Sequence, residues 1–190
     1  PSIAEIDINP LIASPERLLA LDARMVLHDP AKQKEVPKPA IRPYPLQYVS
    51  RGTMKDGRDI TIRPIRSEDE PLMAEFHRTL SDRTVYLRYF NSLSLSARIS
   101  HERLLRICFG DYEHEMVLVV EHRDLDTGKP EIYGVGRLNK LRDQNEAEVA
   151  VLVSDAYQNQ GLGLKLLRRI IDVARDEKLS RVSSQMLGNN

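Results

Sequence analysis

The sequence lacks the features that define several classes of protein. It has one cysteine in 190 residues, no tryptophan, and a formal net charge of zero from 28 basic and 28 acidic side chains. A lone cysteine forms no internal disulfide, which indicates a reducing compartment and a cytoplasmic location. The balanced charge disfavours a nucleic-acid or anionic-membrane partner, because such binding usually needs a basic excess.

Long hydrophobic runs are also missing. The longest, such as 116–120, have about five residues, whereas a membrane-spanning helix needs roughly 20. The sequence does not begin with a basic segment followed by an apolar stretch, so no secretory signal is expected. The five histidines lack the spacing of metal ligands, so we expect no metal site. The composition, 41% hydrophobic and 29% charged, is instead typical of a globular protein.

Three stretches of the chain differ in character. Residues 1–30 show the pattern of a small β unit, with Ile3, Ile6 and Ile8 near Asn9-Pro10. Residues 31–50 are rich in proline, which fixes φ and removes backbone donors, and are expected to form a linker. Residues 51–190 alternate helix and strand patterns and predict a domain of the α/β (α+β) class.

Hydrophobic periodicity and turn residues predict the elements of this domain. Ser67 is expected to be an N-cap that forms a capping box with Glu70. We expect strands over 59–65, 116–121, 132–138, 146–154 and 181–187, and further helices over 81–90, 97–109 and 161–178.

One segment of the sequence indicates a ligand-binding site. The strand 146–154 leads into the turn Gln-Asn-Gln-Gly-Leu-Gly at 158–163, and a long amphipathic helix follows. A glycine-rich turn before a helix presents free backbone N–H groups and the positive end of the helix dipole to a phosphate or pyrophosphate. The turn lacks the Gly-Lys-Ser/Thr of a P-loop and the three-glycine spacing of a dinucleotide fold.

This strand, turn and helix resemble motif A of the GNAT superfamily, the acetyl-CoA-dependent N-acyltransferases. The resemblance to this superfamily covers residues 51–190. The resemblance implies a central mixed, mostly antiparallel sheet flanked by helices, with acetyl-CoA as co-substrate. A GNAT domain normally continues with one more helix and two strands, so the C-terminal arm is expected to be missing here, and with it the residue that protonates the leaving thiolate.

Other segments, 86–90, 111–116 and 146–148, resemble the bacterial protein lysine acetyltransferases of the Pat type. In those proteins the GNAT domain follows an acyl-CoA-synthetase-like region of the NDP-forming type. Residues 5–11 and 21–24 look like the end of its ATP-grasp domain, so 1–30 are interpreted as a C-terminal remnant of that region.

The resemblance implies transfer of acetyl to a lysine ε-amine on a partner protein, for example an acyl-CoA synthetase. Three alternatives stay open: a GNAT enzyme acting on a small amine, a non-catalytic acyl-CoA-sensing module, and a parent protein whose function is that of an ATP-dependent ligase. The sequence indicates neither the acyl-chain preference nor an oligomeric state.

The resemblance also implies roles for individual residues. Glu148, ten residues before Gln158, is the expected general base, with Glu146 as its rival, and the valines after Glu148 predict partial burial. Backbone groups near Leu152 and Val153 would hold the thioester and the pantetheine arm, which Asn190 would also contact. The residues expected to bind the pyrophosphate are Gln158, Gln160, Gly161, Gly163, Leu164 and Lys165.

Overall fold

The computed structural model describes residues 3–29, 42–125, 127–141 and 144–187. The chain forms two units, 1–41 and 42–190, and each is described by itself. Within the described residues, no helix combines the length and the apolar character needed to cross a membrane. Residues 42–50, which the sequence assigned to the linker, lie in the second unit, where Tyr48 is buried.

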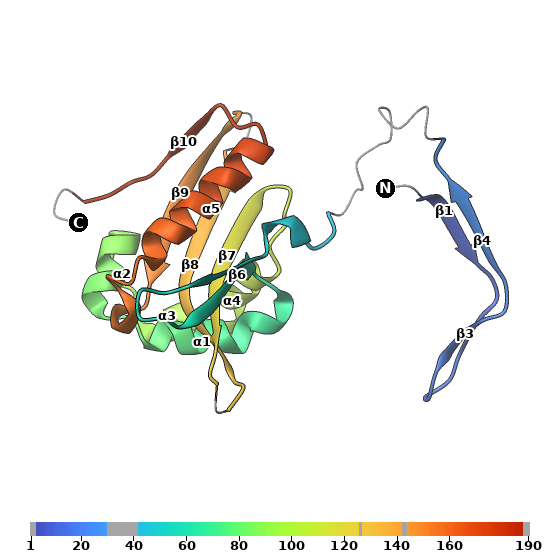
Figure 1. Ribbon diagram of the computed structural model, residues 1–190, viewed down its shortest axis with the longest axis horizontal. Coiled ribbons are helices and arrows are strands. Elements are labelled where there is room, and N and C mark those ends of the chain that lie inside the picture. The colour runs from blue at the N-terminus through green and yellow to red at the C-terminus, as the bar shows by residue number, and fades with distance from the viewer. Residues whose placement is uncertain (1–2, 30–41, 126, 142–143, 188–190) are drawn as a thin grey trace. The chain divides into compact units, whose positions relative to one another are not determined.

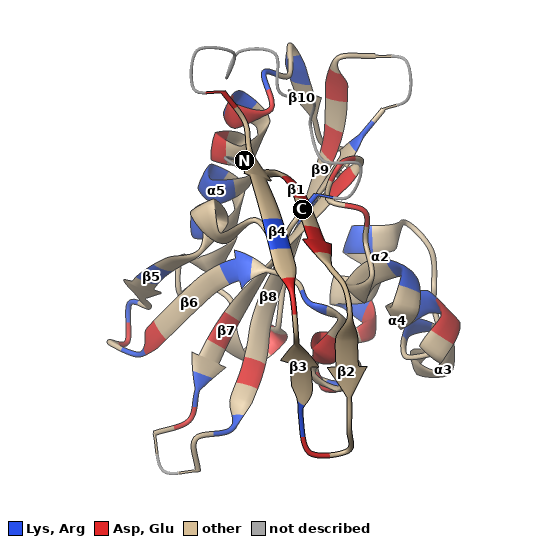
Figure 2. Cartoon of the chain, turned by 90° about the vertical axis from the view of Figure 1, so that its right-hand side faces the viewer, with Lys and Arg blue, Asp and Glu red and all other residues tan. Residues whose placement is uncertain are grey.

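The first unit is an antiparallel ribbon. β1 (Ile3–Ile8) pairs with β4 (Ala23–Leu27), and β2 (Leu11–Ala13) pairs with β3 (Leu18–Ala20). Figure 2 shows β2 and β3 without charged residues and the charges in the turn between them. Since two strands alone cannot enclose a core, their apolar side chains stay exposed.

A six-stranded sheet forms the centre of the second unit (Figure 1). Its order is β10-β9-β8-β7-β6-β5, and every neighbouring pair is antiparallel except β9 and β10, which are parallel. The strands are β5 (Ser50–Thr53), β6 (Asp59–Pro64), β7 (Glu115–Arg123), β8 (Pro130–Lys140), β9 (Glu146–Val153) and β10 (Arg181–Ser183).

Helices cover both faces of the sheet. The long helix α5 (Leu162–Asp176) packs on one face through buried residues such as Leu166 and Ile170. The helices on the other face are α1 (Glu70–Arg78), α2 (Asp82–Tyr89), α3 (Leu95–Arg98) and α4 (His101–Cys108). The expected mixed, mostly antiparallel sheet flanked by helices is therefore confirmed.

Alternation along β9 separates these two faces. Ala147 and Val149 pack in the core beneath α5, whereas Leu152 packs in the core beneath α1 and α4. Because successive strand side chains point to opposite faces, Glu148 and Ala150 share the α1–α4 face with Leu152.

Two helix predictions need correction. The expected helix 97–109 is divided into α3 and α4, with Ile99 and Ser100 between them. Ser67 is not the N-cap of α1, because it begins a short 3-10 turn, and the Asp69 carboxylate accepts a hydrogen bond from the Arg66 backbone N–H at 2.8 Å. The sequence could not show that the Asp69 side chain is held by a distant strand.

That strand residue is Arg63, at the centre of a buried charge network. Its guanidinium donates two hydrogen bonds of 2.7 Å to Asp69 and one of 2.7 Å to Glu121. Burial alone would lower the pKa of Arg63, but the two carboxylates raise it above its ordinary value. The network ties β6, β7 and the start of α1 together.

Replacing Arg63 tests this network. In Arg63→Met, the buried Asp69 carboxylate loses its cation and Glu121 keeps only its ion pair with Arg123. The free energy of unfolding should therefore fall by about 3–5 kcal/mol in urea denaturation. Arg106→Met is the matched control, because Arg106 pairs with Glu102 on the exposed surface of α4 and such pairs contribute little. Equal small losses in both variants would contradict a stabilising role for the network.

Candidate active site

A cleft opens where β10 separates from β9. The two strands pair only over three residues, from Arg181 opposite Glu146 to Ser183 opposite Glu148. Sequence reasoning predicted a longer strand, 181–187, but β10 ends at Ser183, and the chain diverges from β9 beyond it (Figure 1). A cleft of about 790 Å³ lies between β9, α2 and residues 184–186, a size typical of ligand sites.

The turn after β9 forms a second, smaller pocket. Asn159 and Gly161 adopt left-handed φ angles of 62° and 83°, and α5 begins at the next residue. Its first intrahelical bond runs from the Lys165 N–H to the Gly161 oxygen, so the preceding N–H groups have no acceptor within the helix. Gly161, Leu162 and Gly163 line a pocket of about 380 Å³, where the helix dipole favours an anion.

Lys55 is a residue of this pocket that sequence reasoning missed. It lies in the turn between β5 and β6, lines the pocket, and its Nζ donates a hydrogen bond to the Asn159 backbone oxygen at 3.0 Å. The ammonium group adds positive charge beside the start of α5. Nothing in the sequence connects residues 55 and 159, because only the fold of the sheet brings these two turns together.

The structure brings most of the expected site residues together. Glu148, Leu152, Val153, Gln158 and Gly163 all line the larger cleft. Val153, Gln158, Gly161 and Gly163 line the pocket at the start of α5.

Three expected residues do not line the pocket, and a fourth is not among the described residues. Leu164 is 54% exposed, and Gln160 is half-buried, but neither lines the pocket. Lys165 extends toward β5, where its Nζ would lie 3.9 Å from a Cβ added to Gly52. Asn190 lies outside the described residues. Lys55 lines the pocket and Lys165 does not; that Lys165 binds a pyrophosphate stays a prediction.

Hydrogen bonds to Asp155 hold α2 against the cleft. The carboxylate accepts bonds from the Ser81 N–H at 2.9 Å, the Ser81 hydroxyl at 2.6 Å and the Thr84 hydroxyl at 2.8 Å. Burial alone would raise the pKa of Asp155, but these hydrogen bonds hold it below its ordinary value. Since Gln158 also donates to Thr84, at 3.3 Å, the wall of the cleft is fixed to the turn.

The two candidate bases on β9 differ in their contacts. The Glu146 carboxylate accepts hydrogen bonds of 2.9 and 2.6 Å from Arg181. Glu148 is half-buried in the cleft, and the described residues offer its carboxylate neither a hydrogen bond nor an ion pair. Glu148 is thus the one of the two that is available to accept a proton.

With this geometry in place, comparison with known proteins is decisive. Residues 59–190 match the family described as acetyltransferase (GNAT) domain. The chain belongs to this family. The expected co-substrate, acetyl-CoA, is consistent with this membership.

Individual relatives agree with this assignment. The chain is 32% identical over 124 residues to acetyltransferase PA5475 of Pseudomonas aeruginosa, covering 65% of this chain and 63% of that protein. The GNAT domain of S. lividans PAT superimposes with a TM-score of 0.67 at 27% identity, covering 78% of this chain and 84% of that one. Mycobacterium smegmatis RimJ, in complex with CoA-disulfide, shares the fold, with a TM-score of 0.57, 15% identity and coverage of 75% and 68%.

The two glycines of the GNAT turn offer a matched test. Both glycines border the pocket, but only Gly161 has a left-handed φ, and a Cβ on Gly163 would meet only Val153 at 4.0 Å. A valine at 161 is strained and adds bulk where phosphates would approach. Calorimetry with acetyl-CoA should show a loss of affinity of about 100-fold or more for Gly161→Val and only a few-fold change for Gly163→Ala. A folded Gly161→Val with wild-type affinity would place the phosphate site elsewhere.

A buried histidine next to the cleft predicts a pH effect on stability. Burial, with the charges of Arg103 and Arg98, lowers the pKa of His77 to about 4, from an ordinary value of 6.5. The unfolded chain therefore takes up this proton first, and stability falls as the pH drops from about 6.5 to 4, by about 3 kcal/mol.

Urea denaturation between pH 7 and 4 measures this effect, and His77→Gln should show a shallower loss of stability than the wild type. NMR titration gives an independent readout. An imidazole of residue 77 that titrates near pH 6.5 in the folded protein would contradict the prediction.

Proposed function

We propose that this GNAT domain transfers acetyl from acetyl-CoA to the ε-amine of a lysine on a partner protein. Glu148 acts as general base, and the transfer occurs directly in a ternary complex. The observation that carries the proposal is the position of Glu148, half-buried and without a hydrogen-bond partner among the described residues, in the cleft that opens beside β9.

The cofactor binds along this cleft. The pyrophosphate accepts hydrogen bonds from backbone N–H groups of the turn and the first turn of α5, with Lys55 supplying positive charge. The pantetheine arm lies beside β9 after Glu148, where β10 no longer pairs with the strand. Backbone N–H groups near Leu152 and Val153 would stabilise the oxyanion that develops on the thioester carbonyl.

As general base, Glu148 removes the proton that keeps the acceptor amine from reacting. A lysine amine has a pKa of about 10.4, so at pH 7 only about 0.04% of it is the neutral nucleophile. A carboxylate in the cleft accepts the proton directly or through one water. The amine nitrogen then forms a bond to the carbonyl carbon, and the carbon–sulfur bond breaks to release the thiolate of coenzyme A.

Two observations support a protein acceptor. The first is the similarity to the GNAT domain of S. lividans PAT, and the second is the resemblance of 86–90 and 111–116 to the Pat type. By the same resemblance, the acceptor is a metabolic enzyme such as an acyl-CoA synthetase. Residues 1–30 are then the end of an ATP-grasp region, and the acetyltransferase domain includes residues 42–50, which lie in the second unit. The buried free thiol of Cys108 fits a cytoplasmic location.

The two glutamates of β9 provide the test. Glu148→Gln should lower kcat by about 10²-fold or more with little change in the Kd for acetyl-CoA, measured by coupled release of coenzyme A with lysine peptides. Glu146→Gln is the control, because Glu146 is occupied by Arg181, and it should keep activity within a few-fold. Full activity of Glu148→Gln would exclude it as the base. Acetyl-CoA binding without turnover, before and after the change, would indicate a sensing module instead.

A further inference from the structure

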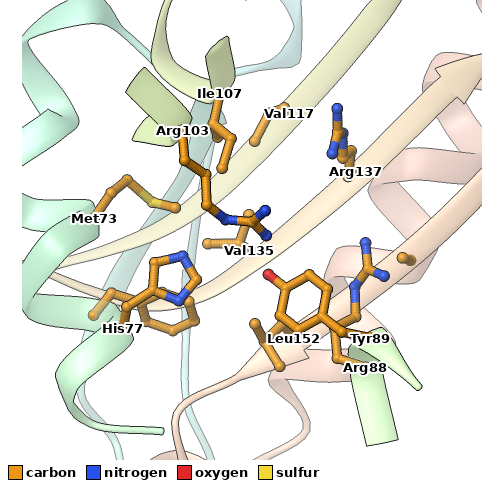
Figure 3. A pocket seen from close by; sticks show the side chains of 12 residues that line it. Met73, His77, Arg88, Tyr89, Arg103, Ile107, Val117, Val135, Arg137 and Leu152 are labelled. Atoms are coloured by element: carbon orange, nitrogen blue, oxygen red, sulfur yellow. The ribbon is translucent and has the colours of Figure 1, made fainter. Parts of the chain in front are cut away.

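A small cavity adjoins the cleft on the face of the sheet covered by α1, α2 and α4 (Figure 3). Its volume is about 40 Å³, and it shares Arg88, Ala150 and Leu152 with the cleft. This space holds more than one water molecule and suits a group of the size of a carboxylate. It lies on the opposite face of the sheet from α5.

Three guanidinium groups gather around this cavity, one each from α2, α4 and β8: Arg88, Arg103 and Arg137. Arg137 donates a hydrogen bond of 2.7 Å to Glu115. In the part of the chain that the structure describes, Arg88 and Arg103 form neither a hydrogen bond nor an ion pair with a carboxylate. Both instead contact the ring of Tyr89, at 5.0 and 5.1 Å from its centroid.

His77 provides an independent indication of a ligand. The side chain is 1% exposed and points into the cavity (Figure 3), and neither ring nitrogen has a hydrogen-bond partner among the described residues. A buried imidazole without a partner is costly. Its lowered pKa keeps it neutral at pH 7, so one nitrogen carries a hydrogen and can donate it to an anion.

The charges around the cavity favour an anion. Burial lowers the pKa of Arg88, and the positive charges of Arg137 and Arg103 act in the same direction, opposed by Tyr89 and Glu148. Like charges that converge at a partly buried site disfavour one another. A carboxylate among them would relieve this repulsion and accept charge-assisted hydrogen bonds.

The register of the sheet places this cavity beside the reaction centre. Arg137 on β8 lies opposite Ala150 on β9, two residues from Glu148 on the same face. At about 3.3 Å per residue, the separation along the strand is about 7 Å. A carboxylate bound there would thus belong to the molecule whose amine faces Glu148.

We propose that the arginine cavity formed by Arg88, Arg103 and Arg137 with His77 selects acceptors that carry a carboxylate close to the reactive amine. This inference rests on the proposed acetyl transfer. The carboxylate can come from an acidic residue beside the acceptor lysine or from the α-carboxylate of a free amino acid. An acceptor without an anionic group, such as a polyamine, gains no binding affinity from the cavity.

Paired acceptors test the proposal. Lysine peptides that differ only in a neighbouring Glu or Gln, free lysine, lysine amide and a polyamine are compared with the full chain at low salt. If the carboxylate comes from a peptide, the wild type should favour the Glu peptide by at least about 10-fold in kcat/KM, mainly through KM. If it comes from a free amino acid, the same preference should appear for lysine over lysine amide.

Arg103→Met should reduce this preference to about two-fold or less, and Arg103→Lys should restore part of it. The control, Arg106→Met, removes the same charge from the exposed surface of α4 and should keep the wild-type ratio. Thermal unfolding followed by circular dichroism checks that each variant is folded.

The outcomes separate the two proposals. The arginine cavity is overturned as a selector if kcat/KM is the same for both members of each pair. It is also overturned if folded Arg103→Met keeps the wild-type preference. Either result leaves the proposed acetyl transfer intact. Binding of acetyl-CoA with no acetylation of any acceptor overturns the proposed function, and this inference with it. Faster turnover of the polyamine than of every carboxylate-bearing acceptor also overturns the inference.

Discussion

The site depends on the short pairing of β9 with β10. Three residue pairs join the strands at their amino-terminal ends, and the backbone of 149–153 then faces the cleft on that side. The pairing must exist, because it fixes β9 as an inner strand of a rigid sheet. It must also end early, because a full-length β10 would fill the space that a pantetheine arm requires. Two hydrogen bonds from Arg181 to Glu146 lie at the end that remains paired.

Alternation along β9 places its side chains on the two faces of the sheet. Residues that face α5 supply the core on which this helix packs. The first residues of α5 line the smaller pocket, beside Lys55. Residues on the opposite face point toward α2 and α4, where Glu148 and the arginine cavity lie. Asp155 joins the turn to α2 through Ser81 and Thr84, so the wall of the cleft and the turn before α5 are positioned by one carboxylate. β9 thus carries both Glu148, which lines the cleft, and Val153, which lines the pocket at the start of α5.

Much of this could be predicted from local pattern. The amphipathic spacing of α5, the glycines at 161 and 163, and Glu148 ten residues before Gln158 are all visible within one segment of the sequence. Interactions between distant segments were not visible. Lys55 reaches Asn159 only after the sheet forms. Asp69 caps Arg66 only because Arg63 orients it, and β10 ends at Ser183, four residues short of the predicted end at Leu187. The arginine cavity combines three elements, none of which has a motif of its own.

The central claim is that coenzyme A occupies the gap between β9 and β10, with its diphosphate at the start of α5. A crystal structure of the chain with acetyl-CoA tests this claim most directly. The account predicts density for the diphosphate within hydrogen-bond distance of the N–H groups of residues 161–164, and for the thioester beside Leu152 and Val153. Density for the cofactor at any other surface, with the cleft filled by solvent, would contradict it.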